Sequence, residues 1–274
     1  MTLSAWVEKG NELYSQDKYD EAIMFYDKAI EIDHQNAELW NLKGLALCRL
    51  GRFDEAIESF DRALERDPLY NDALNNMGVV FYKQEKYDKA IIYFDRIIEA
   101  TSKYTKAWYN KGVVLDKMGE YQEAIEYYNK ALELNPSGAR IWNNKGTALA
   151  NLGKYDESLE CFEESISIRS ENAETWNNKG AALGKLGRYN EAEECFDRAL
   201  EIAPRHPEAI YNLGEAFRRQ DKPADAIWYF DKAIEIDSKC VKAWNSKGLA
   251  LMAMGRPEEA DAAFARAREL GYTS

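Results

Sequence analysis

The sequence has 274 residues, of which 46% are apolar, and its formal net charge is -12. This apolar fraction is ample for a packed core and excludes a disordered chain, while the acidic balance argues against partners such as nucleic acid or anionic membranes, which require a basic surface. No segment approaches the roughly 20 consecutive apolar residues of a membrane-spanning helix, and residues 1–11 lack the apolar core of a signal peptide. We therefore expect a cytoplasmic protein that binds neither nucleic acid nor membranes.

A single glycine recurs through the whole chain at intervals of 34 residues, without an insertion or deletion. A fixed period of this length is the signature of a stacked repeat array. We number each repeat so that this glycine is repeat position 8, which predicts one array over residues 1–274 with no second domain. The glycines are Gly10, Gly44, Gly78, Gly112, Gly146, Gly180, Gly214 and Gly248, and the repeats are 3–36, 37–70, 71–104, 105–138, 139–172, 173–206, 207–240 and 241–274.

Each repeat has the pattern of two helices, as the second repeat illustrates. Trp40, Gly44 and Leu47 follow one another at helical spacing and predict a first helix. Gly51 ends it, and a second amphipathic helix follows, for which Asp54 is a suitable capping residue. Because one such pair cannot bury its apolar face alone, its stability must come from neighbouring pairs.

Three further positions are shared by most or all repeats. Position 4 is tryptophan in six of them, position 20 is always alanine or serine, and position 24 is always phenylalanine or tyrosine. With the glycine, these residues resemble the tetratricopeptide repeat, whose 34-residue pattern is W-x2-L-G-x2-Y, then A-x3-F, then P. The resemblance covers all eight units and implies an all-α, right-handed superhelical α-solenoid. One departure is systematic, because position 7 is lysine in six repeats, and we expect its stem to cover apolar surface while its ammonium reaches water.

In the resembled family, the first helices line a concave groove, and asparagine at position 6 grips the backbone of a bound peptide. An amide suits this role because it both donates and accepts hydrogen bonds. The structural alternative is that asparagine is ordinary family composition at these places. Position 6 is Asn76, Asn110, Asn144, Asn178 and Asn212, and position 5 supplies Asn41, Asn75, Asn143, Asn177 and Asn245.

Cations and tyrosines accompany the asparagines on the first helices. Position 13 carries Arg49, Lys83, Lys117, Lys185 and Arg219, which would favour acidic side chains, although solubilising surface charge explains them nearly as well. Tyr109 and Tyr211 at position 5 are candidate anchors, or they pack on an adjacent helix. Positions 1–14 of the eight repeats sum to a charge of +7 in a chain of -12, which predicts a mildly basic groove.

No catalytic or phosphate-binding motif is present, and the four cysteines and two histidines show no metal-ligand spacing. We therefore expect a non-catalytic scaffold, without cofactor or metal, that binds an extended polar or acidic peptide segment of another protein. Two alternatives remain open: a module that self-assembles through its array ends, as an end-to-end homodimer instead of a monomer, and a recruiting subunit of a separate enzyme. Charged Asp261 and Arg268 favour a last helix that caps the array itself.

Overall fold

The computed structural model describes residues 2–272, and these residues form sixteen α-helices with no strand among them. They divide into two compact units, residues 1–136 and residues 137–274. The all-α fold of paired helices that the sequence predicted is confirmed. None of the helices within residues 2–272 combines the length and the apolar character that spanning a bilayer requires.

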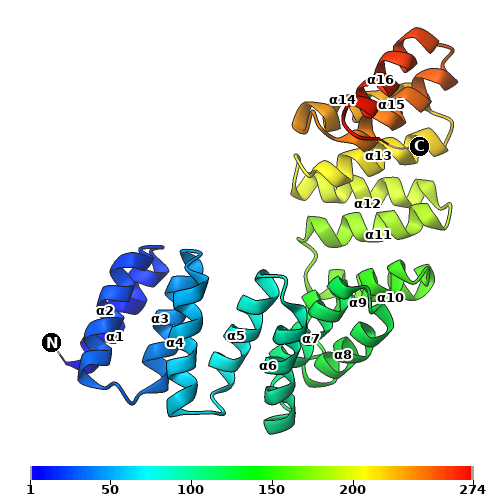
Figure 1. The fold of residues 1–274 in the computed structure, drawn as a ribbon. Coiled ribbons are helices and arrows are strands. Elements are labelled where there is room, and N and C mark those ends of the chain that lie inside the picture. The colour runs from blue at the N-terminus through cyan, green and yellow to red at the C-terminus, as the bar shows by residue number, and fades with distance from the viewer. Residues whose placement is uncertain (1, 273–274) are drawn as a thin grey trace. The chain divides into compact units, whose positions relative to one another are not determined.

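Unit 1 consists of four helical pairs, which Figure 1 shows in blue to green. Each odd-numbered helix packs against the even-numbered helix after it, and α2, α4 and α6 each pack against the odd-numbered helix that follows. In addition, α3 contacts α5 and α5 contacts α7, so the first helices of successive repeats lie side by side. The helices are α1 (Leu3–Ser15), α2 (Tyr19–Ile32), α3 (Ala37–Arg49), α4 (Phe53–Arg66), α5 (Asn71–Lys83), α6 (Tyr87–Ala100), α7 (Thr105–Met118) and α8 (Tyr121–Leu134).

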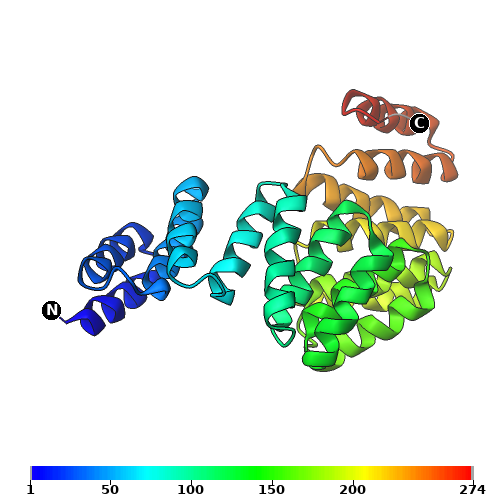
Figure 2. The same ribbon diagram turned by 60° about the horizontal axis from the view of Figure 1, so that its bottom comes forward.

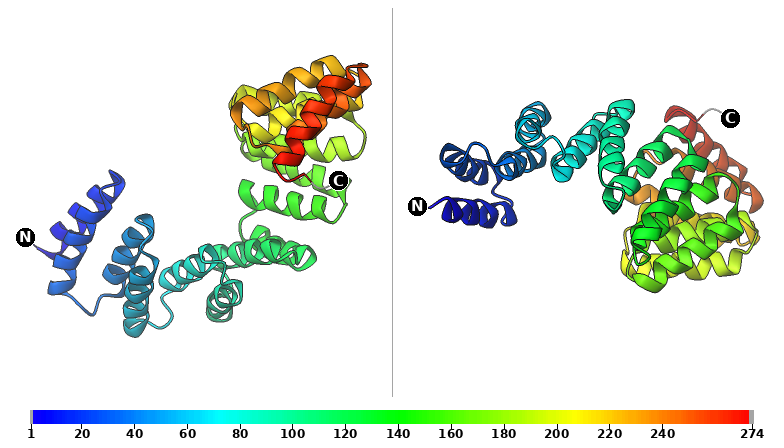
Figure 3. Two further views of the ribbon diagram at one scale, coloured as in Figure 1. Left: turned by 45° about the horizontal axis from the view of Figure 1, so that its top comes forward. Right: turned by 90° about the horizontal axis from the view of Figure 1, so that it is seen from below.

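Unit 2 repeats this arrangement with four more pairs, which Figures 2 and 3 show from other sides. Its first helices α9, α11, α13 and α15 contact one another in succession. Asp261 and Arg268 both lie exposed on the last helix. The helices are α9 (Ala139–Asn151), α10 (Tyr155–Ile168), α11 (Ala173–Lys185), α12 (Tyr189–Ile202), α13 (Pro207–Arg219), α14 (Pro223–Ile236), α15 (Val241–Ala253) and α16 (Pro257–Glu269).

The recurring glycine is explained by the ring at position 24 of the same repeat. A Cβ atom built on Gly44 would lie 2.5 Å from the ring of Phe60, and one on Gly180 would lie 2.6 Å from the ring of Phe196. Both rings are buried. Glycine is therefore required where the two helices of a pair close on an aromatic side chain, because any larger residue would push the ring away.

The position-4 tryptophans tie each first helix to the turn that precedes it. The indole nitrogen of Trp40 donates a hydrogen bond to the carbonyl of His34 at 3.1 Å, and that of Trp176 donates to Ser170 at 2.8 Å. Trp108 and Trp244 make the same bond to the residue six places earlier. In these four repeats the half-buried tryptophan therefore links the first helix to the preceding turn.

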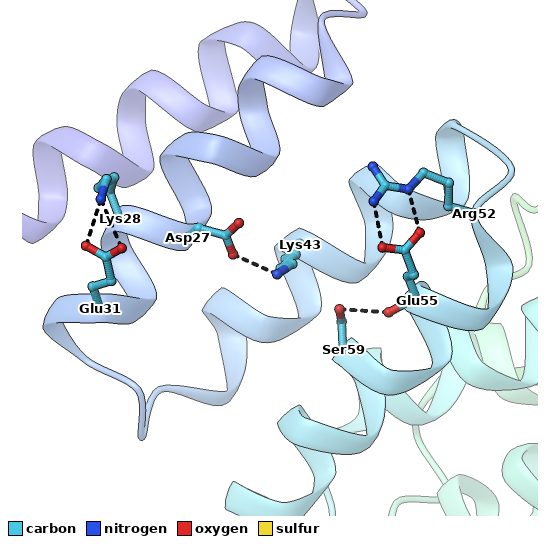
Figure 4. Close-up of polar contacts among 7 residues, drawn as sticks. All are labelled: Asp27, Lys28, Glu31, Lys43, Arg52, Glu55 and Ser59. Carbon is cyan, nitrogen blue, oxygen red and sulfur yellow. Dashed lines mark hydrogen bonds and ion pairs between the residues drawn. The ribbon is translucent and has the colours of Figure 1, made fainter.

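The second helices begin as predicted, but without the predicted cap. Gly51 has φ +74° and separates α3 from α4, yet the residue that precedes α4 is Arg52, and its side chain makes no capping hydrogen bond. Asp54 lies within the first turn, so its assignment as a cap was wrong. Instead the carboxylate of Glu55, in the same turn, accepts hydrogen bonds from Nε and Nη2 of Arg52, at 2.7 and 2.6 Å (Figure 4). The negative charge of Glu55 is favourable at the positive end of the helix, and its ion pair with Arg52 links the first turn to the residue that precedes the helix.

The four cysteines are free thiols, and Cys161 and Cys195 are buried in unit 2. Burial raises the pKa of both thiols to about 11. At neutral pH they are therefore protonated and behave as small apolar core residues. Among the residues that the structure describes, no group of three or more potential metal ligands lies together.

Candidate functional site

The asparagines at positions 5 and 6 bond to each other between neighbouring repeats. Four of the five position-6 asparagines donate through Nδ2 to the Oδ1 atom of the position-5 asparagine one repeat earlier, and these paired residues form what we call the asparagine ladder. In unit 1 the bonds are Asn76 to Asn41 at 2.8 Å and Asn110 to Asn75 at 2.7 Å, and in unit 2 they are Asn178 to Asn143 at 3.3 Å and Asn212 to Asn177 at 3.0 Å.

The two positions of the ladder differ in how far they reach the surface. The position-5 asparagines Asn41, Asn75, Asn143 and Asn177 are buried, so their amides serve the stacking of the repeats. The position-6 asparagines are half-buried. Within the part of the chain that the structure describes, Asn178 and Asn212 act only as donors through Nδ2, and neither Oδ1 atom accepts a hydrogen bond from protein. Asn144 is also half-buried and accepts a bond from Asn143 at 3.3 Å.

The two predicted tyrosines pack against the second helix of their own repeat. The ring of Tyr109 lies 6.1 Å from that of Tyr128, and the ring of Tyr211 lies 5.9 Å from that of Phe230. The hydroxyl of Tyr211 also lies 3.4 Å from Oγ of Ser246 in the next repeat. Tyr211 is at position 5 and Ser246 at position 6, so this contact joins the same two positions as the asparagine ladder. Both tyrosines are half-buried, and Tyr211 lines a cavity of unit 2.

The cations at position 13 are exposed, and their surroundings differ between the two units. Arg49 donates through Nε to the hydroxyl of Tyr19 at 3.0 Å, and the ammonium of Lys83 lies 5.9 Å from the ring centre of Phe53, so both rest against aromatic rings of unit 1. Lys117 stands exposed near the end of α7. Lys185 and Arg219, by contrast, line hollows in the surface of unit 2.

Four of the six position-7 lysines pair with the acid at position 25 of the preceding repeat. Lys111 is one of them, and it is buried, against the expectation for this position, with its ammonium 2.5 Å from Asp95. Figure 4 shows the equivalent pair of Lys43 and Asp27, at 2.7 Å. Lys179 with Glu163 and Lys247 with Asp231 complete the set, at 2.9 and 2.5 Å.

These ion pairs change the charge of the groove that the sequence suggested. Six of the positive charges counted on the first helices are position-7 lysines, and those that form these pairs are neutralised between helices. In two repeats position 7 is Met77 or Leu213 instead of lysine. The acids at position 25 of the repeats before them, Asp61 and Asp197, therefore have no such partner, and burial raises the pKa of both. Basic character on the open surface must therefore come from other residues.

Two adjoining cavities lie along the first helices of unit 2. The larger has a volume of about 550 Å³ and lies along α11 and α13, where Asn212, Lys185 and Arg219 contribute to its lining. The smaller, of about 410 Å³, lies along α9 and α11 and includes Asn178. They share Ala181 and Lys185, so together they form one depression, which we call the α9–α13 groove.

Small side chains at repeat positions 9 and 12 open this groove. They are Thr147 and Ala150 on α9, and Ala181 and Gly184 on α11. A Cβ atom built on Gly184 would meet nothing within 4 Å, in contrast to one on Gly180 in the same helix. The tyrosine at position 17 of each of these repeats, Tyr155 or Tyr189, consequently lines a cavity.

The larger cavity is predominantly basic. Lys185, Arg219 and Lys242 lie on its lining, and the only acid there is Glu215. Glu215 is already engaged, because Arg218 binds it at 2.9 Å and Arg219 approaches to 4.0 Å. Burial acts to raise the pKa of Glu215, but hydrogen bonds from Arg218 and Ser246 and the nearby arginine charges outweigh it and lower the pKa. At neutral pH the carboxylate is charged and largely compensated, which leaves an excess of cations.

Family models match almost the whole chain. Models described as tetratricopeptide repeat match residues 41–105, 105–137, 139–172, 171–239 and 241–270, and one described as TPR repeat matches residues 10–51. The chain belongs to the tetratricopeptide repeat family. Repeats of this family build protein-interaction scaffolds, and this TPR chain is such a scaffold. No curated protein matches the sequence.

Solved structures of TPR proteins share the fold. A tetratricopeptide repeat protein from Parabacteroides merdae superposes with a TM-score of 0.69 at 20% identity, covering 87% of this chain and 94% of that one. A chain of the APC/C hetero-tetramer Cut9–Hcn1 gives 0.72 at 17% identity, covering 96% and 52%. YrrB, described as a TPR protein with an unusual peptide-binding site, gives 0.58 at 24% identity, covering 70% and 98%. At these identities the likeness concerns the fold alone.

Proposed function

We propose that this TPR chain is a non-catalytic scaffold that binds an extended, polar or acidic segment of another protein along its first helices. The eight repeats would act as one array, with the position-6 asparagines bonding to the backbone of the segment. The observation that carries the proposal is the α9–α13 groove, where Asn178 and Asn212 line the same depression as Lys185 and Arg219. The described peptide-binding site of YrrB offers a precedent on the same fold.

The chemistry of the groove fits an extended segment. A peptide strand without its own secondary structure exposes N–H and C=O groups that need partners. In the ladder, Nδ2 of Asn212 donates to Asn177, so the side chain is held in place while its oxygen has no protein donor and would accept a backbone N–H of the segment. Such a preorganised amide binds with less loss of side-chain entropy than a mobile one. Exposed cations beside it would favour acidic side chains.

The proposal can be tested by capture of partners from a lysate of the source cells. The test variant carries Asn178→Ala and Asn212→Ala, and the matched control carries Asn76→Ala and Asn110→Ala. Each variant removes two ladder bonds to buried asparagines, so both should lose similar stability, on the order of 1–3 kcal/mol for each unsatisfied group. Only the first removes residues that line the α9–α13 groove.

We expect the native protein to retain a partner that the Asn178/Asn212 variant loses while circular dichroism shows it still helical. Loss with the control variant as well would extend the site to the ladder of unit 1. Retention of the same partner by a folded Asn178/Asn212 variant would contradict the proposal and would place binding on another surface. Because stability is matched, the comparison separates a lost contact from a weakened fold.

A further inference from the structure

The larger cavity of the α9–α13 groove differs chemically from a surface that only holds peptide backbone. Its volume of about 550 Å³ is within the range of sites that enclose small ligands, about 300–1,000 Å³. Its floor is made of small residues, Ala181, Gly184 and Ala216, and the rings of Tyr189, Phe196 and Tyr211 also line it. A floor without side-chain bulk beside aromatic rings accommodates a large apolar side chain from a ligand.

The rim of this cavity selects for negative charge next to that side chain. Lys185 and Lys242 are exposed, and neither forms an ion pair within residues 2–272. Arg219 is exposed too, and it is only loosely associated with Glu215, at 4.0 Å. Cations on three helices, α11, α13 and α15, thus line the same cavity as these small residues and aromatic rings. This combination is complementary to a carboxylate-rich segment with a single bulky apolar residue.

We propose that the larger cavity is a side-chain pocket for an acidic segment of a partner protein, which inserts one aromatic or large aliphatic residue over Gly184 and against Tyr189. Carboxylates on either side of that residue face Lys185, Arg219 and Lys242. The inference rests on the proposed function and makes it more specific, because it names the kind of sequence that the groove reads. Gly184 is the residue to vary, because it lines the cavity and a Cβ atom built on it meets nothing within 4 Å, so a large side chain there has room to fill the pocket.

The test uses synthetic peptides, so it does not depend on knowledge of the partner. Three fluorescein-labelled nonapeptides are compared by fluorescence anisotropy with the full chain: one with a central phenylalanine flanked by aspartates, one with alanine in place of the phenylalanine, and one with lysines in place of the aspartates. We expect the phenylalanine peptide to bind about tenfold to a hundredfold more tightly than the alanine peptide, because a buried aromatic ring supplies that difference. The lysine peptide should not bind measurably.

Three variants locate the effect within the groove. Gly184→Tyr fills the pocket and should abolish the preference for phenylalanine over alanine, whereas Gly184→Ala keeps most of the space and should retain it. Ala150→Tyr is the matched control, because it fills only the smaller cavity, and it should leave the preference unchanged. If Gly184→Tyr fails to fold, Lys185→Ala with Lys242→Ala replaces it and should weaken binding of both acidic peptides equally.

Equal affinity of the native protein for the phenylalanine and alanine peptides would overturn the inference, as would failure of all three peptides to bind. An unchanged preference in folded Gly184→Tyr would also overturn it, because the ring would then bind elsewhere. None of these results bears on the lysate experiment with the ladder asparagines. A groove that captures its partner through Asn178 and Asn212 while ignoring these peptides would keep the proposed function and refute only the pocket.

Discussion

The first helices of the two units differ at repeat position 12, and this difference decides whether the tyrosine at position 17 is covered or lines a cavity. In unit 1, Tyr14 packs edge-on against Tyr19, with 5.2 Å between ring centres, and Tyr82 lies 6.0 Å from Tyr87. In unit 2, the corresponding residues of the first two repeats are Ala150 and Gly184, so Tyr155 and Tyr189 line cavities instead.

The comparison shows that different positions of the repeat serve stability and recognition. The glycine at position 8 and the ring at position 24 are buried in both units, and the asparagine ladder is formed in both. Position 12 lies outside that framework, so its side chain can be as large as tyrosine or as small as the hydrogen atom of glycine without changing how the helices stack. Binding character can then vary from repeat to repeat while the architecture stays constant.

The strongest test of this separation uses two glycines in α11. Gly180→Ala should destabilise the protein by about 1–3 kcal/mol, because its Cβ would lie 2.6 Å from the ring of Phe196 and the packed core must shift. Gly184→Ala, four residues later, should stabilise it by about 0.5–1 kcal/mol, because alanine favours helix and its Cβ meets open space. Chemical denaturation measures both. Changes of the same sign would refute the division between framework and groove positions.

A second test opens unit 1 in the way that unit 2 is open. Tyr82→Ala uncovers Tyr87 and should cost about 1–2 kcal/mol, less than a full aromatic burial because Tyr82 is half-buried. Tyr82→Phe keeps the ring and should stay within about 0.5 kcal/mol of the native protein. Urea unfolding of both variants measures these differences. If Tyr82→Ala were as stable as Tyr82→Phe, the ring would not be a packing element of unit 1.

Much of this molecule could be predicted from sequence, because the 34-residue period and the size of each residue determine the helical pairs. The site was harder to predict, since its contacts join different repeats. Asn75, Asn143 and Asn177 were assigned to the groove, yet they are buried and accept the inter-repeat bonds of the ladder. A signal for the lysine pairs was available: four of the six lysines at position 7 follow an acid sixteen residues earlier, as in Lys43 with Asp27 and Lys111 with Asp95.

The cavity itself depends on small residues at positions where other repeats carry large ones, and a motif search does not detect such an absence of side-chain volume. Ala150, Ala181 and Gly184 are unremarkable helix residues when they are read singly. Their significance appears only when repeats 5 and 6 are aligned with repeats 1 and 3, where Tyr14 and Tyr82 occupy position 12. A comparison of side-chain volume at equivalent positions would have located the groove from the sequence.

A third test asks whether the ladder contributes equally to both units. Double-mutant cycles for Asn110 with Asn75 and for Asn212 with Asn177, each residue changed to alanine, should give coupling free energies of about 0.5–1.5 kcal/mol, as expected for a single hydrogen bond. The two values should agree, because the bonds measure 2.7 and 3.0 Å and both acceptors are buried. A coupling near zero in unit 2 alone would mean that its asparagines are held in place by something other than the ladder.

The smallest expected effect concerns the one acid in the groove. Glu215→Gln removes a charge that partly neutralises Arg219, so the affinity for an acidic phenylalanine peptide should rise by about twofold to fivefold, the range of an exposed or half-exposed ion pair. Glu208→Gln changes the net charge by the same amount on the same helix, but it lies exposed and outside the cavity lining. If the two variants gained affinity equally, the effect would reflect only the overall charge of the protein. A gain confined to Glu215→Gln, and reduced by added salt, would show that unit 2 reads charge within the groove where unit 1 presents packed tyrosines.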